Sequence, residues 1–147
     1  MKIKIISISD SEKHFLQAIK EYEKRLGSSL EIINIKPEKN GTKPSIIGSE
    51  TDKIIKALGK DTNYKLLLSI NGNNIDTINL SKVINKEIQI TFIIGGPYGL
   101  DEDKLDKYID KKISFGNITL PHPLAKLVLI EQIYRCKTII DNKTYHY

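Results

Sequence analysis

The chain has 147 residues, of which 39% are hydrophobic and 28% charged, and its formal net charge is +5. This length predicts a single domain, residues 1–147, that buries roughly two-thirds of its unfolded surface, and the single cysteine, Cys136, excludes an internal disulfide. No apolar run approaches the roughly 20 residues that span a bilayer, and the opening MKIKIISIS lacks a signal-peptide cleavage pattern, so we expect a cytoplasmic protein that does not enter a membrane.

In the first half of the chain, strands alternate with helices. Lys2 to Ile8 alternates in hydrophobicity, as a strand does, and Ser9-Asp10-Ser11 offers side-chain caps for the helix that follows. Gly48 interrupts the second helical pattern. The elements expected here are a strand at 2–8, a helix ending at Gly27, a strand at 30–36, a helix at 45–58, a strand at 64–70 and a turn at 71–74.

The second half continues the alternation. It predicts a helix at 76–85, a strand at 90–94, a helix at 100–110, a strand at 112–115, a loop at 116–123, a helix at 124–136 and an extended tail at 138–147. Strands that alternate with helices are typical of an α/β fold, so we expect a mostly parallel sheet flanked by helices.

The stretch from Ile90 to Leu100, ITFIIGGPYGL, is the most informative part of this pattern. Five β-branched or aromatic residues predict a strand buried on both faces, and a turn containing Gly95, Gly96 and Gly99 follows it directly. Open α/β sheets bind ligands at the carboxyl ends of their strands. This turn is therefore either a ligand site or an ordinary connection from strand to helix.

The residues around the turn argue against several kinds of ligand. The acids at 101–103 would repel a phosphate, and the glycines match neither a P-loop nor a dinucleotide fingerprint. His14, His122 and His146 are too widely spaced to predict a metal site. Cys136 ends an apolar helical run and is better interpreted as a small core residue than as a nucleophile. A plain nucleotide-binding domain thus stays a weaker alternative.

The positive charge has two interpretations. Excess lysine is typical of proteins that bind nucleic acid and also of ordinary solvated surfaces. The polar loop at 37–44, PEKNGTKP, is likewise either an RNA-facing loop or a linker. Only two of the 23 basic residues are arginine, Arg25 and Arg135. A guanidinium makes the planar, two-pronged contacts that a lysine cannot, which marks both as candidates for a specific role.

The helix at 124–136 is apolar nearly all round, which indicates burial on several sides, and one of those sides could be another subunit. Before this helix, the strand end at 68–70, the turn at 95–99 and the loop at 116–121 could converge at one edge of the sheet. A site built mostly of backbone and apolar walls suits an uncharged heterocycle such as adenine.

Four motifs together indicate a family. IIGGPYGL is followed by ITLPHPLAK, then LIEQIYR, and finally TYHY at the end of the chain. At this spacing they resemble the ribosomal RNA large subunit methyltransferase H family, which belongs to the SPOUT superfamily of S-adenosylmethionine-dependent RNA methyltransferases. The resemblance covers the whole chain. It implies a SPOUT-type fold with a C-terminal trefoil knot, a homodimer, and methylation at N3 of a pseudouridine in 23S rRNA of the ribosome, without a metal.

The resemblance also implies which residues form the site. Cofactor contacts would be Leu68, Ser69, Gly95, Gly96, Gly99, Gly116, Asn117, Ile118, Thr119, Leu120 and Pro121, and residues acting near the substrate would be His122, Arg135, Tyr145 and His146. The chain departs from the family pattern at Ser69, where aspartate is usual, and at Thr144 and Tyr147, where proline and a basic residue are usual.

Structural alternatives exist for each substrate-side residue. His122 could only fix its loop, Arg135 could only pair with Glu131 four residues earlier, and Tyr145 and His146 could belong to a frayed terminus. For the whole protein, the alternatives are a SPOUT enzyme with a different RNA target and a non-catalytic module that binds RNA or ribosomes.

Overall fold

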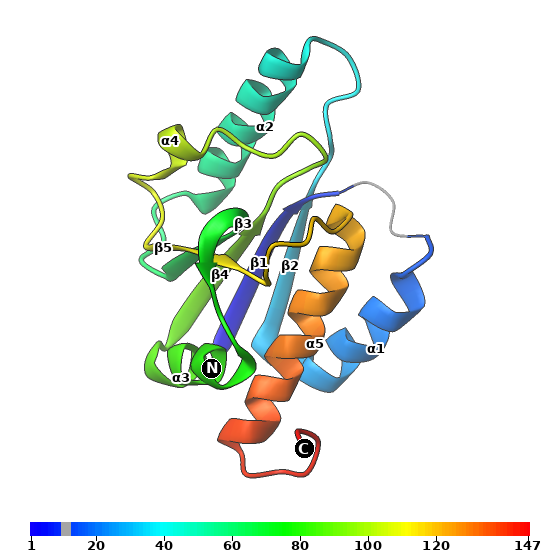
Figure 1. The fold of residues 1–147 in the computed structure, drawn as a ribbon, viewed down its shortest axis with the longest axis vertical. Helices are drawn as coiled ribbons and strands as arrows, with labels where there is room; N and C mark the ends of the chain where they lie inside the picture. The colour runs from blue at the N-terminus through cyan, green and yellow to red at the C-terminus, as the bar shows by residue number, and fades with distance from the viewer. Residues whose placement is uncertain (10–12) are drawn as a thin grey trace.

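A sheet of five parallel strands forms the centre of the protein (Figure 1). The computed structural model describes residues 1–9 and 13–147. The strand order is β2-β1-β4-β3-β5, and every adjacent pair is parallel, which confirms the predicted α/β class. The strands are β1 (Lys2–Ile8), β2 (Leu30–Ile35), β3 (Tyr64–Asn74), β4 (Gln89–Ile94) and β5 (Lys111–Ser114).

Helices cover both faces of the sheet because its central strands are apolar on both sides. Successive side chains of a strand point to opposite faces. Ile5 and Phe92 accordingly pack in one core with α1, α3 and α5, whereas Ile6 and Ile93 pack in a second core with α2 and α4. The helices are α1 (Leu16–Leu26), the 3₁₀ turn η1 (Gly27–Ser29), α2 (Lys43–Leu58), α3 (Thr77–Lys86), α4 (Glu102–Leu105) and α5 (His122–Ile140).

The predicted helix at 100–110 is wrong in length, because α4 ends at Leu105. The chain beyond Leu105 is hydrogen-bonded to the neighbouring strand β3. The backbone N–H of Asp110 donates to the carbonyl of Lys65 at 2.9 Å, and the Asp110 carboxylate accepts the Lys65 N–H at 2.7 Å. These bonds bring the segment alongside β3, where β5 then pairs.

The predicted turn at 71–74 is also wrong, because these residues belong to β3. Both Leu68 and Asn73 pair with Ile113, so the strand contains an irregularity between them. A Cβ at Gly72 would lie 2.6 Å from the backbone nitrogen of Ile113. Glycine inside a strand often marks such a close approach of two backbones.

Other predicted bounds differ at element ends. Gly48 does not interrupt α2, which runs unbroken through it. The last helix begins at His122 and continues to Ile140, so the tail predicted at 138–147 is helical at its start. The predicted caps at Asp10 and Ser11 lie outside the described residues. Within the described ranges, no helix is long and apolar enough to cross a membrane.

Candidate functional site

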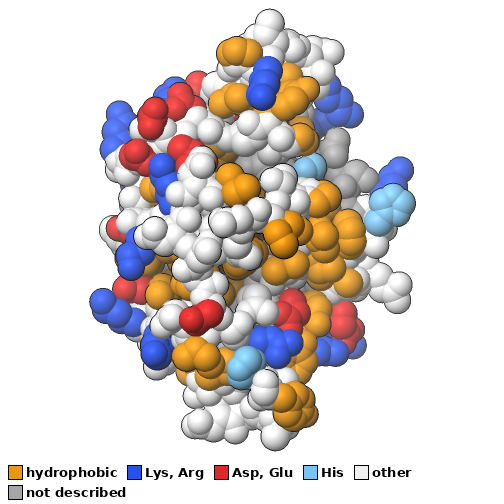
Figure 2. Space-filling model, viewed as in Figure 1, with side chains coloured by type: hydrophobic (Ala, Val, Ile, Leu, Met, Phe, Trp, Pro, Cys, Tyr) orange, Lys and Arg blue, Asp and Glu red, His pale blue; other side chains and the backbone are white. Residues whose placement is uncertain are grey.

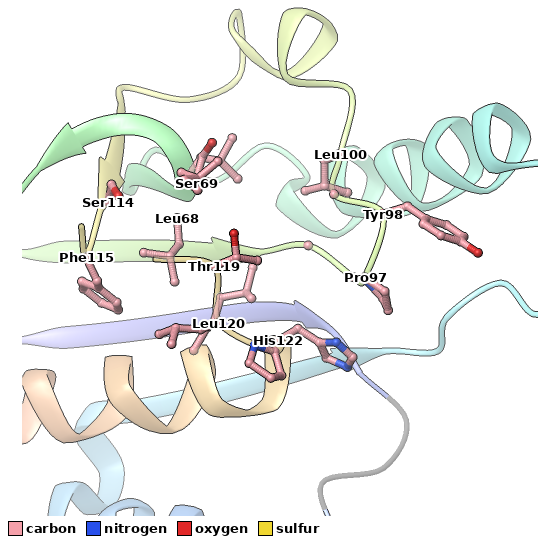
Figure 3. A pocket seen from close by; sticks show the side chains of 18 of the residues that line it. Leu68, Ser69, Pro97, Tyr98, Leu100, Ser114, Phe115, Thr119, Leu120 and His122 are labelled. Carbon is pink, nitrogen blue, oxygen red and sulfur yellow. The ribbon is translucent and has the colours of Figure 1, made fainter. Parts of the chain in front are cut away.

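A cavity of about 740 Å³ lies where β3, β4 and β5 approach the loops that follow them (Figure 3). Segments far apart in the sequence form its walls, namely residues 67–70 of β3, the glycine turn after β4, and the chain from Ser114 into the start of α5. Cavities of roughly 300–1,000 Å³ are the size that holds small-molecule ligands. The three segments that sequence analysis expected to converge therefore do so.

The turn after β4 is tight and closely packed. Gly99 donates its backbone N–H to the carbonyl of Gly96 at 3.0 Å and has φ +75°, a conformation that favours glycine. A Cβ at Gly95 would lie 2.9 Å from Leu100 Cγ. Packing against Leu100 at Gly95 and the positive φ at Gly99 thus both favour glycine in this turn.

Glu50 of α2 lies beneath the same turn. Its side chain is buried, and its Oε2 accepts the backbone N–H of Glu38 at 3.0 Å, which fixes the loop between β2 and α2. Its Oε1 has no hydrogen-bond partner among the described residues. A Cβ at Gly96 would come within 3.0 Å of this oxygen and 3.1 Å of Ile8 Cγ2. Because Gly96 has no Cβ, the buried carboxylate of Glu50 can lie this close to the turn.

The loop before α5 closes the cavity from the other side. Gly116 donates its N–H to Ser114 Oγ at 3.1 Å, the Ser114 hydroxyl donates to the Gly116 carbonyl at 2.8 Å, and Gly116 has φ +119°. Figure 3 shows Leu68, Thr119 and Leu120 facing the same space, while Tyr98 points away from it. The walls on this side are mainly backbone and apolar side chains.

The charge of the lining is unusual for a site of this size. None of the described residues that line it is lysine or arginine, and Glu102 is the one carboxylate among them. Glu102 Oε2 accepts a hydrogen bond from Ser69 Oγ at 2.7 Å, and Oε1 lies 3.4 Å from Lys112 Nζ. Such a lining suits a neutral or cationic ligand with hydroxyl groups and disfavours a phosphate.

A second cluster, of polar side chains, lies toward the far end of α5. Figure 1 shows the chain turning back after this helix. Arg135 donates to Glu131 Oε1 from Nη2 at 2.6 Å and from Nε at 3.0 Å. Its guanidinium carbon lies 4.7 Å from the ring centre of Tyr145, and its Nη1 lies 3.4 Å from His146 Nδ1. The hydrogen bond to Glu131 raises the pKa of Arg135.

Tyr145 is bonded into this cluster rather than frayed. Its hydroxyl donates to Glu131 Oε1 at 3.2 Å and lies 3.1 Å from the hydroxyl of Tyr22 on α1. Its ring packs edge-on against Tyr134 with 4.9 Å between ring centres. Burial, followed by the Tyr22 hydrogen bond and the Glu131 charge, raises the pKa of Tyr145.

The predicted site residues therefore fall into two groups. Leu68, Ser69, Gly95, Gly96, Gly99, Gly116, Ile118, Thr119, Leu120, Pro121 and His122 line the cavity, and Asn117 does not. Arg135, Tyr145 and His146 lie together elsewhere. His122 and Arg135 are thirteen positions apart on α5, which corresponds to roughly 20 Å along a helix. Within one chain, the cavity and this cluster are separate.

Sequence reasoning missed two lining residues that matter chemically. Glu102 lies three positions after Gly99 and was interpreted only as a helix-start acid, and Phe115 lies between β5 and the second loop. Cys136 is buried, and burial raises the pKa of its thiol to about 12, as suits a core residue. Over the described residues, no group of three acidic, histidine or cysteine side chains could hold a metal ion.

Known proteins match the chain over almost its whole length. A family model described as "Predicted SPOUT methyltransferase" matches residues 1–146. The ribosomal RNA large subunit methyltransferase H of Limosilactobacillus reuteri is 41% identical over 161 residues, and that of Streptococcus suis is 39% identical over 160. The protein of the same name from Enterococcus faecalis is 38% identical over 159 residues. In each comparison 99% of both chains is covered.

Proposed function

The chain belongs to the SPOUT methyltransferase family, and from this premise we propose that it transfers a methyl group from S-adenosylmethionine to N3 of a pseudouridine in 23S rRNA of the large ribosomal subunit. Relatives that are 38–41% identical over nearly their full length carry the name of a large-subunit rRNA methyltransferase. The proposal includes the family's C-terminal trefoil knot and action in the cytoplasm.

The character of the cavity is the observation that carries the proposal. S-adenosylmethionine combines an uncharged adenine, a ribose with two hydroxyls, a cationic sulfonium, and an amino-acid end whose ammonium and carboxylate charges cancel. The lining offers backbone groups and apolar walls from Leu68, Phe115 and Leu120, one carboxylate, and no lysine or arginine among its described residues. ATP and NAD carry phosphates that such a lining would leave without a cationic partner.

The chain's own residues would hold this donor in defined ways. The glycine turn at 95–99 and the loop at 116–121 would present backbone N–H and C=O groups to the adenosine and methionine parts, and Leu68 with Leu120 would form an apolar wall. When bound, the sulfonium supplies an activated methyl group, so the protein's task is to orient the acceptor and exclude water.

On the substrate side, we assign Arg135 to the uracil-like ring. N3 of pseudouridine carries a proton that is lost on methylation, and a guanidinium stabilises the negative charge that develops on the ring. Tyr145 and His146 adjoin Arg135 and would close over the base by stacking and hydrogen bonding. His122 lines the cavity at the start of α5 and would act at its rim.

A homodimer would reunite the two separate groups of residues. Arg135 is too far along α5 to reach the cavity of its own chain, so we propose that the cluster of one subunit serves the cavity of the other. Leu124, Leu127 and Val128 remain only half-buried on the same helix. Figure 2 shows hydrophobic side chains gathered over this part of the molecule. Such a surface is typical of an interface between subunits.

The test is methyl transfer from labelled S-adenosylmethionine to large ribosomal subunits that lack the modification, followed by mapping of the labelled nucleotide. We expect N3-methylpseudouridine in 23S rRNA. Label at another position would support a SPOUT enzyme with a different target. Cofactor binding without transfer would favour the non-catalytic RNA- or ribosome-binding module, and binding of ATP or NAD in place of S-adenosylmethionine would overturn the family-based proposal.

Oligomeric state provides an independent test of the homodimer. Light scattering at micromolar concentration should give twice the mass of one chain. A monomer that retains full activity at that concentration would contradict the assignment of Arg135 to a partner's cavity.

A further inference from the structure

Glu102 is the one carboxylate among the described residues lining the cavity, and it begins α4 three positions after Gly99. We propose that this carboxylate binds the two hydroxyl groups of the methyl donor's ribose. The inference rests on the function proposed above and assigns a contact that the family resemblance did not imply. It concerns donor binding and not the methyl transfer itself.

The carboxylate is held in place before any ligand arrives. Oε2 accepts the Ser69 hydroxyl at 2.7 Å, and Ser69 Oγ in turn accepts the backbone N–H of Asn71 at 3.1 Å. Oε1 lies 3.4 Å from Lys112 Nζ. The Glu102 side chain retains 24% of its exposure. Because an ionised carboxylate has about four acceptor positions, it can still accept two further hydrogen bonds.

A diol fits this carboxylate better than a second cation does. Lys112 already pairs with Glu102 and with Asp106, whose oxygen is 2.9 Å away. Another ammonium would compete with Lys112 for the same negative charge. Two adjacent hydroxyls instead donate two short, charge-assisted bonds without adding positive charge. Of the groups on the donor, only the ribose offers such a pair.

Ser69 acquires a different role in this arrangement. Its single hydroxyl proton is committed to Glu102, and its oxygen also accepts the Asn71 N–H. Ser69 is therefore a positioning residue that holds the carboxylate in the cavity wall, and loss of its hydroxyl should weaken the ribose contact through Glu102.

The experiment is calorimetric titration with two ligands that lack the sulfonium charge, S-adenosylhomocysteine and its 2′,3′-dideoxy counterpart. Wild type is compared with Glu102→Gln and with the control Asp106→Asn, which removes the other partner of Lys112 without altering the cavity lining. We expect Glu102→Gln to weaken S-adenosylhomocysteine about tenfold or more. The dideoxy ligand should bind wild type and Glu102→Gln equally, and Asp106→Asn should match wild type with both ligands.

Each other result has a defined meaning. Unchanged S-adenosylhomocysteine affinity in Glu102→Gln, or an equal loss with both ligands, would overturn the ribose contact and leave the proposed function standing. An equal loss of affinity in Asp106→Asn would show that Glu102 affects ligand binding only by pairing with Lys112. If wild type binds neither S-adenosylhomocysteine nor S-adenosylmethionine, that result would contradict the proposed function itself, and the ribose contact with it. If circular dichroism shows that Glu102→Gln does not fold, Ser69→Ala is tested in its place. We expect Ser69→Ala to lower the affinity for S-adenosylhomocysteine about threefold and to leave the affinity for the dideoxy ligand unchanged.

Discussion

The cavity and the C-terminal cluster at opposite ends of α5 are built by different means. The cavity consists mostly of backbone and apolar surface, and its shape depends on glycines at 95, 96 and 99. The cluster consists of side chains, with Arg135, Glu131 and Tyr145 satisfying one another through hydrogen bonds and ring contacts. The cavity would therefore bind a ligand mainly through its shape, whereas the cluster holds the charged guanidinium of Arg135 in a fixed position.

Because the two regions differ in this way, we expect substitutions in them to change different properties of the protein. A methyl group added within the cavity wall should alter donor binding, whereas removal of a charge from the cluster should alter catalysis and leave donor binding intact. A substitution in either region that affected both properties equally would contradict the division.

The largest effect is expected for Arg135→Ala. Loss of the guanidinium removes the group assigned to the developing charge, so methyl transfer should fall about 100-fold or more. Donor affinity, measured by calorimetry, should stay unchanged because Arg135 is assigned to the acceptor base and is not among the described residues that line the donor cavity. Single-turnover assays on large ribosomal subunits measure the transfer rate.

Arg25→Ala is the matched control for this change. Arg25 is the other arginine of the chain and also bonds a glutamate four residues earlier, Glu21, at 3.1 Å. Its guanidinium lies 5.3 Å from the ring centre of Tyr134, which packs against Tyr145, but Arg25 is not assigned to the base. Arg25→Ala should therefore lose far less of the transfer rate than Arg135→Ala. Equal losses in both variants would show that Arg135 acts through the aromatic packing that it shares with Arg25 and not through a contact with the base.

Gly96→Ala should produce the next largest effect, on donor affinity. The added Cβ would meet Glu50 Oε1 at 3.0 Å and Ile8 Cγ2 at 3.1 Å, and both atoms are buried. Overpacking of this kind costs about 1–3 kcal/mol of stability and shifts the backbone. Because the shifted turn lines the cavity, S-adenosylmethionine should bind about tenfold more weakly. Calorimetry gives the affinity, and urea unfolding shows how much of the change is loss of stability.

Gly48→Ala provides the comparison within the same fold. A Cβ there meets nothing within 4 Å, and the residue lies inside α2. This variant should gain up to about 1 kcal/mol of stability from helix propensity with unchanged donor affinity. If it weakened donor binding as much as Gly96→Ala, close packing at the turn would not be the cause.

Tyr145→Phe should have a smaller effect that depends on pH. The pKa of Tyr145 is raised above its ordinary value of 10.0 in the folded protein, so its contribution to stability is complete below pH 10 and is lost as pH rises through the folded pKa. The difference in unfolding free energy between wild type and Tyr145→Phe should therefore shrink above pH 10. Urea titrations at pH 8 and pH 11 measure this difference, and a constant value would show that the pKa of the half-buried Tyr145 phenol is not raised.

Cys136→Ala should have the smallest effect, because the residue belongs to neither region. The thiol is buried on α5 and donates to the Thr77 carbonyl at 3.7 Å, and burial raises its pKa to about 12. The variant should keep methyl transfer within about twofold of wild type while losing some stability. In the native protein, iodoacetamide at pH 8 should leave the thiol unmodified, and rapid labelling would show that α5 opens.

Much of the fold could be predicted from local patterns. The strand at 90–94 and its glycine turn were identified because a run of β-branched residues followed by glycine has few other structural solutions. The prediction of a helix at 100–110 was wrong because Asp110 bonds to Lys65. The prediction of a turn at 71–74 was wrong because Gly72 lies against Ile113. Both errors arise from partners distant in sequence.

The sequence by itself determined the alternation of strands and helices, the loops that line the cavity, and, through four motifs, the family. Only the tertiary structure decided that Glu102 lines the cavity with Ser69 bonded to it, and that Arg135, Tyr145 and His146 lie together away from His122. Local propensity acts over a few residues, whereas each of these placements depends on how the sheet order and the long α5 bring distant side chains together or hold them apart.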